Sequence, residues 1–291
     1  MSASPESFTA HARQRPAWRT FVTMTPTADV VAYEVRASRW NGPALNIACL
    51  ADSHAMRPWS PLTALARHVE AVNRMAPDIV MLLGDYQSPH STPGPSEDIA
   101  AQARILARLE APLGVHAILG NHDWRDDPAA QESGMQTTSV SQALTEAGIR
   151  PLINTARRVT QAGQDFWVVG LDSQCAHRPD GGRGRQDADQ AFAEVPDDSL
   201  AILLAHEPDY FIHGDRRPVL QLSGHTHGGQ ANLFGWRPFT PSAHSARYAY
   251  GHIVEEGQHL VVSAGLGYTH VPLRIMQPPE ITLVRLTGED D

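Results

Sequence analysis

The chain has 291 residues, of which 42% are hydrophobic, and a formal net charge of −9 at pH 7. This length allows one large domain or two small ones, either with an ample core. The negative net charge excludes a broad nucleic-acid-binding face. No apolar run approaches the roughly 18 residues of a membrane span. The absence of lysine excludes P-loop and Schiff-base lysine chemistry.

The first half of the chain alternates between predicted strands and helices. Residues 1–27 are rich in Ala, Ser, Thr and Pro, and we expect a partly disordered or loosely docked extension before a single domain over 28–291. Residues 30–38 alternate in hydrophobicity, and Asn41-Gly42 predicts a hairpin turn into the next strand. Further strands are expected at 47–51, 79–83 and 115–119, and helices at 62–75, 99–109 and 139–147.

The second half is richer in strands. Between residues 149 and 171, Ala162-Gly163 predicts a turn joining two strands, and 178–185 forms a Gly-rich loop. Short aliphatic runs predict buried strands at 200–205, 219–222 and 280–286. Cys49 and Cys175 lie in or near strands, where we expect two buried thiols of a reduced compartment rather than a disulfide. The pattern predicts mixed sheets with helices outside.

Polar segments follow five of these strands at the points where they end. Taken singly, each is typical of a surface turn or a hydrogen-bonded core histidine. Together they bring Asp, His and Asn side chains to strand ends, where open α/β sheets bind ligands, and this composition is typical of a metal site. The segments are Asp52-Ser53-His54, Gly84-Asp85, Gly120-Asn121-His122-Asp123, His206 and Gly224-His225-Thr226-His227-Gly228-Gly229-Gln230.

This ordered set resembles the calcineurin-like metallophosphoesterase superfamily, whose pattern is Asp-x-His, Gly-Asp, Gly-Asn-His-Asp/Glu, His and Gly-His-x-His. The end of the chain is similar to the YkuE-like bacterial phosphodiesterase branch. The matching residues there are 224–230, Arg247, Tyr248, Gly251, 265–267, 272–274 and 278–281. The resemblance implies a four-layer α/β/β/α sandwich of two mixed sheets flanked by helices.

The resemblance also implies two divalent ions, with Mn²⁺ favoured over Fe²⁺, Zn²⁺ or a mixed pair. One ion would take Asp52, His54 and His227, and the other Asn121, His206 and His225, while Asp85 would bridge both. Mixed carboxylate, imidazole and amide ligands suit such borderline ions. A metal-bound hydroxide would attack phosphorus, and His122 would protonate the leaving oxygen.

Two positions depart from the pattern of the wider superfamily. Ser88 stands where many relatives have an Asp that orients the catalytic His, and Asp123 is a candidate replacement. Pro89 and Leu119 stand where protein Ser/Thr phosphatases have arginines, which argues against a protein phosphatase.

Two arginines and four aromatic residues are candidates for contact with the substrate. Arg247 and Arg274 are candidate phosphate-binding residues, although surface or strand-capping arginine is the alternative. Aromatic residues that follow or flank the motifs could wall the cleft or belong to the core. They are Trp59, Tyr86, Trp124 and Phe234.

We therefore expect a hydrolase of phosphodiesters or pyrophosphates, acting on a small-molecule or lipid-linked substrate and on no nucleic acid polymer. The expected location is the cytoplasm, in solution or at the membrane surface. One alternative is hydrolysis of UDP-2,3-diacylglucosamine in lipid A synthesis. The other is a non-catalytic, metal-stabilised binding protein, which the complete ligand set and His122 disfavour.

Overall fold

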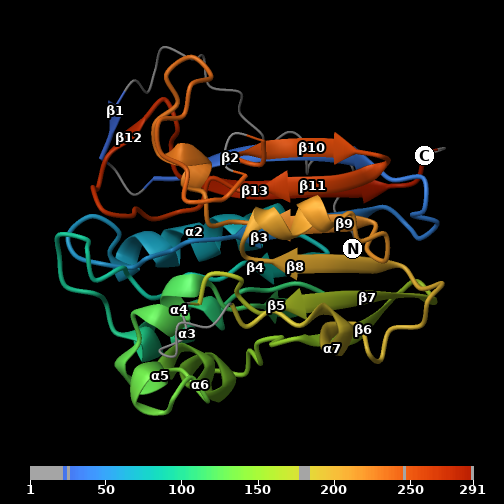
Figure 1. The fold of residues 1–291 in the computed structure, drawn as a ribbon, viewed down its shortest axis with the longest axis horizontal. Coiled ribbons are helices and arrows are strands. Elements are labelled where there is room, and N and C mark those ends of the chain that lie inside the picture. Colours follow the sequence, from blue (N-terminus) through green and yellow to red (C-terminus); the bar gives the residue numbers. More distant parts are fainter. Residues whose placement is uncertain (1–21, 25–26, 177–183, 245–246, 290–291) are drawn as a thin grey trace.

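The computed structural model describes residues 22–24, 27–176, 184–244 and 247–289. Two β-sheets pack face to face in the middle of the molecule (Figure 1). Helices α2 (Leu62–Met75), α3 (Ile99–Leu106) and α6 (Ser139–Glu146) cover the outer face of one sheet. Helix α7 (Ala188–Ala191) and the 3₁₀ helix η1 (Pro208–His213) cover the outer face of the other. The predicted four-layer sandwich is confirmed.

The first sheet has five strands in the order β2-β13-β3-β4-β5. They are β2 (Asp29–Arg36), β13 (Glu280–Thr287), β3 (Leu45–Leu50), β4 (Ile79–Leu82) and β5 (Val115–Ala117). The hairpin predicted at Asn41-Gly42 is wrong, because β13 lies between β2 and β3, parallel to β2 and antiparallel to β3. The carboxyl ends of β3, β4 and β5 meet at one edge because these three strands are parallel.

The second sheet has six strands in the order β10-β11-β9-β8-β7-β6. They are β6 (Thr155–Gln161), β7 (Gln164–Leu171), β8 (Ala201–Ala205), β9 (Leu220–Ser223), β10 (Gly251–Glu255) and β11 (Gln258–Val262). Strands β6 and β7 form the hairpin predicted at Ala162-Gly163. Strands β7, β8, β9 and β11 are parallel to their neighbours in that series, so their carboxyl ends also share an edge.

The predicted helices are present with small differences at their ends. Helix α2 (Leu62–Met75) has the predicted bounds, while α3 (Ile99–Leu106) and α6 (Ser139–Glu146) end slightly earlier. The side chains of Asp98 and Thr138 cap α3 and α6 by accepting backbone N–H groups. Short elements were not predicted: α4 (Asn121–Arg125), α5 (Pro128–Glu132), α7 (Ala188–Ala191), η1 (Pro208–His213) and η2 (His227–Gly229).

Alternating side chains on the central strands fill two different layers. On β3, Ile47 and Cys49 face the second sheet, whereas Ala48 and Leu50 pack against the helices. Strands buried on both faces are therefore apolar at nearly every position, which explains the continuous aliphatic runs in the sequence. Because each strand is apolar along its length, the polar segment that follows it lies at the edge of the sheet.

A small third sheet joins the chain near residue 22 to the C-terminal region. Strand β1 (Val22–Thr23) pairs antiparallel with β12 (Arg274–Ile275), so the end of the predicted extension is attached there. Residues 1–21 and most of the Gly-rich loop lie outside the described residues, and the division at residue 27 stays a prediction. Cys49 and Cys175 are free, although Cys175 is only partly buried. Among the described helices, none combines the length and apolar character of a membrane span.

Candidate metal centre

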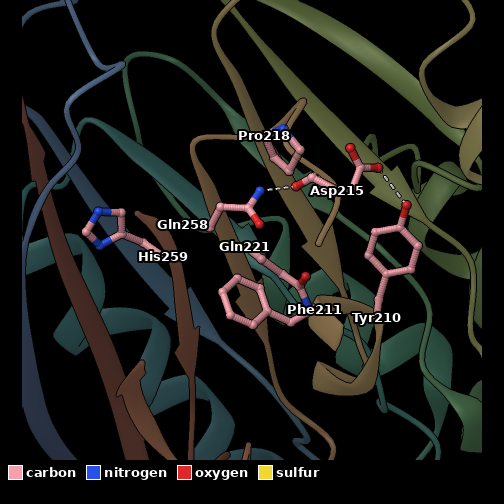
Figure 2. Close-up of a pocket in the computed structure, with 7 residues that line it drawn as sticks. All are labelled: Tyr210, Phe211, Asp215, Pro218, Gln221, Gln258 and His259. Carbon is pink, nitrogen blue, oxygen red and sulfur yellow. Dashed lines mark hydrogen bonds between the residues drawn. The ribbon is translucent and has the colours of Figure 1, made fainter. Parts of the chain in front are cut away.

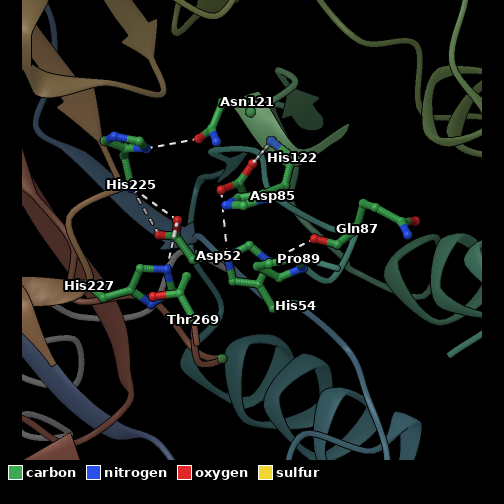
Figure 3. A network of polar contacts seen from close by, with 12 residues as sticks. Asp52, His54, Asp85, Gln87, Pro89, Asn121, His122, His225, His227 and Thr269 are labelled. Atoms are coloured by element: carbon green, nitrogen blue, oxygen red, sulfur yellow. Dashed lines mark hydrogen bonds and ion pairs between the residues drawn. The ribbon is translucent and has the colours of Figure 1, made fainter. Parts of the chain in front are cut away.

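The polar segments from both sheets converge where their parallel strands end (Figure 3). Asp52 and His54 follow β3, Asp85 follows β4, and Asn121 begins α4 after β5. The second sheet contributes His206 after β8 and two histidines after β9, at positions 225 and 227. All seven side chains are almost completely buried.

Five of the seven predicted ligand residues have a left-handed backbone. The φ angles are 51° at Asp52, 36° at His54, 58° at Asp85, 68° at His225 and 52° at His227. Positive φ is uncommon for residues other than glycine and costs free energy, and such residues concentrate at functional sites. The sharp turns direct these side chains back toward one another.

One group of ligand atoms comes from Asp52, His54 and His227. Their ligand atoms lie within 4.8 Å of one another. Nε2 of His227 is 3.7 Å from Oδ1 of Asp52, and the His54 and His227 rings stack with centroids 5.1 Å apart. This is the set that the sequence assigned to the first ion.

A second group comes from Asp85, His206 and His225, whose ligand atoms also lie within 4.8 Å of one another. Oδ1 of Asn121 lies 2.9 Å from Nδ1 of His225, so the amide joins the same group. Nε2 of His225 is hydrogen-bonded to the Pro241 carbonyl, which leaves Nδ1 as its ligand atom. This is the set assigned to the second ion.

Asp85 lies between the two groups. Its Oδ2 is 3.1 Å from Nε2 of His206 and 3.5 Å from Nε2 of His54. Its Oδ1 accepts a hydrogen bond of 2.8 Å from the backbone N–H of His122. A carboxylate in this position can serve two cations at once.

Unpaired ring nitrogens show that the centre fits metal ions. The Nδ1 atoms of His54 and His206 each donate to a backbone carbonyl at 2.7 Å, of Gln87 and Leu83 respectively. Their Nε2 atoms therefore point into the centre, and these atoms, like Nε2 of His227, are buried without a hydrogen-bond partner. The 3.1 Å approach of His206 to Asp85 is an electrostatic contact outside hydrogen-bond geometry. Two divalent cations would satisfy all three nitrogens.

The electrostatics of the pocket also favour cations. Burial lowers the pKa of His54 to about 3 and that of His227 well below its ordinary value, so both rings are neutral. Burial also opposes ionisation of Asp85 and His206, but their mutual attraction outweighs it. The pKa of Asp85 lies well below, and that of His206 well above, the ordinary value. Burial raises the pKa of Asp52 to about 7, because it outweighs the opposing effects of His206 and Arg274.

His122 has an orienting partner that the sequence reasoning missed. Its Nδ1 is hydrogen-bonded to Oδ2 of Asp126, four residues further along, and Nη2 of Arg125 lies 2.9 Å from Nδ1 and 3.1 Å from Nε2. The spacing of four residues was the available signal, since residues i and i+4 of a helix are neighbours. The ligand atom of His122 lies within 4.8 Å of those of His54 and Asp85, so the ring borders the metal centre.

Asp123 does not make the expected contact with the His122 ring, and this assignment is wrong. Its two carboxylate oxygens accept four backbone N–H groups at 2.8–2.9 Å, from Gly120, Asp85, Tyr86 and Gln87. Asp123 therefore ties the turn after β4 to the turn after β5. Ser88 donates its hydroxyl to the Ala55 carbonyl.

The geometry also argues against the two predicted substrate arginines. Arg274 is fully buried, and its guanidinium donates to the carbonyls of Gly265, Gly267 and His227. Burial lowers its pKa to about 10. It supports the segment that carries His227 and cannot reach a substrate. Arg247 is exposed, but Glu255 occupies its guanidinium through two contacts of 2.6 and 2.7 Å.

The predicted aromatic wall separates into two kinds of residue. Tyr86 and Trp124 are 4% and 1% exposed and belong to the core between the first sheet and its helices. Trp59 is partly exposed, and Phe234 is 85% exposed. Only the last two are accessible.

A small cavity lies away from the metal centre, between η1 and the strands β9 and β11 (Figure 2). It is lined by Tyr210, Gln221 and His259, among others, and its volume is about 10 Å³. This is at most enough for one water molecule, so the cavity does not compete with the metal centre as a substrate site.

Comparisons with known proteins point to one family. The model of the family described as "Calcineurin-like phosphoesterase" matches residues 45–229, more than half of the chain. An uncharacterized metallophosphoesterase of Bacillus subtilis, YkuE, is 30% identical over 81% of this chain and 76% of its own length. The phosphodiesterase YaeI of Escherichia coli is 28% identical over 89% of this chain and 88% of its own length. A crystal structure of a dimetal phosphatase from Danio rerio is 14% identical over 77% of this chain and 88% of its own, with a TM-score of 0.41.

Proposed function

Since this chain belongs to the calcineurin-like phosphoesterase family and is a metal-dependent phosphoesterase, we propose that it hydrolyses phosphodiester or pyrophosphate bonds at a centre of two metal ions. The ion pair, when bound, would neutralise phosphoryl oxygens and activate a water molecule for in-line displacement. The observation that carries the proposal is the position of Asp85 between two ligand groups in which the Nε2 atoms of His54, His206 and His227 have no hydrogen-bond partner.

The proposed ligands are the seven residues of the two groups. Asp52, His54 and His227 would hold one ion, and Asn121, His206 and His225 the other, with Asp85 shared. The donor set contains nitrogen and oxygen but no thiolate, since Cys49 faces the space between the sheets and Cys175 belongs to neither group. Such a set suits Mn²⁺, which is our first proposal for both positions, with Fe²⁺ or Zn²⁺ as alternatives.

His122 is the proposed proton donor to the leaving oxygen. Its Nδ1 is held by Asp126, so the ring can offer a proton only through Nε2. The backbone N–H of the same residue donates to the bridging carboxylate of Asp85, which fixes the ring beside the reacting centre. A positioned histidine of this kind supplies roughly 10²–10⁴ of rate enhancement.

The scarcity of free cations supports a substrate with a single charge on the reacting phosphorus. Among the described residues, Arg274 is fully buried and engaged by the loop that carries His227, Arg247 is paired with Glu255, and Arg125 lies beside His122. A monoester dianion carries one more negative charge and normally requires additional cationic contacts. The relative from Escherichia coli is named a phosphodiesterase, which agrees with this proposal.

The test compares bis-p-nitrophenyl phosphate with p-nitrophenyl phosphate at one fixed Mn²⁺ concentration, because partial occupancy would confound the comparison. We expect a larger kcat/KM for the diester. A nucleotide-sugar pyrophosphate serves as the second substrate with a single negative charge on the reacting phosphorus. A preference for the monoester under matched conditions would contradict the diesterase proposal and leave the metal assignment standing.

A further inference from the structure

Most of the exposed apolar side chains lie on one part of the molecule beside the metal centre. We call this part the aromatic tip, and it comprises residues 22–24, 231–241 and 269–275. Among the described residues, seven large hydrophobic side chains are exposed, and five of them belong to the tip. They are Met24 (47% exposed), Phe234 (85%), Trp236 (65%), Phe239 (78%) and Val271 (57%).

The aromatic tip is a single connected substructure. Strand β1 pairs with β12, and Ala231 forms a bridge with Ile275 of the same strand. The amide of Gln230 donates to the carbonyls of Thr269 and Val271. Figure 1 shows β1, β12 and the loop after η2 together at one end of the molecule. The tip also adjoins the ligands, because the Pro241 carbonyl holds Nε2 of His225.

Phe234 occupies the end of a tight turn in an unfavourable backbone conformation. Leu233 and Trp236 form an antiparallel bridge, and the N–H of Gly235 donates to Oδ1 of Asn232 at 2.7 Å. Within this turn Phe234 has a φ of 55°, which is rare for a bulky residue. The chain therefore bears backbone strain at the position where it exposes an aromatic ring to water, and such strain is concentrated at functional positions.

The charge of the tip differs from that of the whole protein. Residues 231–250 and 257–279 contain no Asp or Glu, in a chain with a net charge of −9. Arg237 lies on the tip, donates to Oε1 of Gln277 and has no carboxylate partner among the described residues. Two acids approach from neighbouring elements, but Asp209 is engaged by Ser242 and Glu255 by Arg247. The tip itself therefore contains no acidic side chain, although the hydroxyl of Ser242 does not neutralise the charge of Asp209.

We propose that the aromatic tip docks on the surface of an anionic lipid bilayer, with Phe234 and Trp236 inserted at the headgroup level. Aromatic side chains favour this level because one side meets acyl chains and the other meets water. An arginine that has no carboxylate partner, on a tip that contains no acidic residue, suits the negative potential of anionic lipids. The exposed rings project from the turn of a hairpin, which suits insertion better than packing against a flat protein face. The proposal does not depend on the reaction at the metal centre.

Vesicle co-sedimentation of the full chain tests the proposal. Vesicles of phosphatidylcholine with equimolar phosphatidylglycerol are compared with vesicles of phosphatidylcholine alone. We expect binding to the anionic vesicles that weakens as salt is added. The double variant Phe234→Ser/Trp236→Ser should lower the partition coefficient by roughly tenfold or more, since burial of one such side chain is worth more than this factor. The matched control is Ile212→Ser/Val254→Ser, which removes the two exposed side chains outside the tip and should bind like the wild type.

Two further measurements separate docking from its alternatives. The double variant should bind Mn²⁺ and unfold in urea like the wild type, which shows that it is folded and that its metal-binding residues are in place. Absence of wild-type binding to anionic vesicles, or undiminished binding of the double variant, overturns the proposal. Loss of self-association in the double variant during analytical ultracentrifugation, without vesicle binding by the wild type, overturns it in favour of a second copy of the chain.

Discussion

The two ring nitrogens of His122 have different surroundings, and this difference defines its proposed role. Asp126 holds Nδ1, Nη2 of Arg125 lies 3.1 Å from Nε2, and one of the two ring nitrogens lies within 4.8 Å of the ligand atoms of His54 and Asp85. Asp126 is itself approached by His90 at 3.1 Å, so the carboxylate is held from two sides. The hydrogen bond and charge of His122 outweigh the effect of burial and lower the pKa of Asp126. Asp126 is therefore an ionised group that can orient the ring.

The first prediction distinguishes the role of His122, the proposed proton donor, from that of Asp126, which positions its ring. His122→Asn should lower kcat by roughly 10²–10⁴ on a phenyl diester and by less on a p-nitrophenyl diester, whose leaving group needs less protonation. Asp126→Asn should show the same dependence on the leaving group with a smaller loss, and both variants should retain their metals. The control is Ser88→Ala, which should behave like the wild type. Equal losses on both diesters for Asp126→Asn would assign it a structural role only.

For single residues, the sequence predicted which side chains form the two ligand groups better than it predicted the partners of His122 and Arg274. The ligands follow from short motifs after strands, and the structure brings all seven together. The partner of His122 was placed at Asp123, because nothing in the local sequence shows that this carboxylate is taken up by backbone N–H groups of two turns. The burial of Arg274 likewise depends on β12 packing against the ligand loops, which is a long-range contact.

At the scale of elements, the turn after β4 packs directly against the turn after β5. A Cβ atom on Gly120 would overlap Oδ1 of Asp85 and lie 2.7 Å from its Cγ. Gly120 has a φ of −103°, so the restriction comes from the carboxylate and not from the backbone angle. The absence of a side chain at the start of α4 therefore sets the position of the bridging carboxylate.

The second prediction concerns this contact. Gly120→Ala should displace Asp85, reduce the metal content, and lower kcat/KM by roughly a hundredfold, the scale expected for misplacement by about 1 Å. Gly163→Ala is the control, because its Cβ would meet nothing within 4 Å and its φ of +84° adds only backbone strain, worth about 1–2 kcal/mol. Metal content is measured by elemental analysis. Full occupancy with normal activity in Gly120→Ala would show that the turn adapts freely.

Element prediction succeeded where the pattern is local. The spacing of apolar residues gave α2 with its observed bounds, and Ala162-Gly163 marked a true hairpin. The turn at Asn41-Gly42 failed, because a turn signal cannot show that β13, more than 200 residues later, pairs with both flanking strands. Short elements such as α4 and α7 have too few residues for a periodic signal.

At the scale of the whole molecule, the buried carboxyl group of Glu280 makes the free energy of unfolding depend on pH. Glu280 begins β13, is 1% exposed, and accepts hydrogen bonds from Tyr250 and Thr282 at 2.6 Å each. Burial raises its pKa from 4.5 to about 7. The folded protein therefore holds this proton more tightly than the unfolded chain, so its contribution to stability is fully present below pH 4.5 and is lost as the pH rises through about 7.

The third prediction follows from this sign. Glu280→Gln should leave the free energy of unfolding nearly unchanged near the unfolded pKa of 4.5 and raise it relative to the wild type above the folded pKa of about 7. The gain has an upper bound of roughly 3 kcal/mol, and urea unfolding at the two pH values measures it. The exposed Glu132→Gln is the control and should show no such difference. A constant difference at both pH values would contradict the shifted titration.

The four-layer architecture brings the proposed metal ligands together only in the complete fold. One ligand group draws on β3 and the segment after β9, and the other draws on β4, β5, β8 and β9. Each ligand group therefore contains residues from both sheets, and Asp85 lies between the two groups. The proposed dinuclear centre thus depends on the packing between the sheets.

Metal stoichiometry tests this centre most directly. Metal-free wild type and Asp85→Asn are titrated with Mn²⁺ by calorimetry, and bound metal is confirmed by elemental analysis. The wild type should bind about two ions per chain with activity following occupancy, and Asp85→Asn should bind at most one ion and lose activity. A wild type that saturates with one ion, or an Asp85→Asn variant that retains two, would contradict a centre bridged by Asp85.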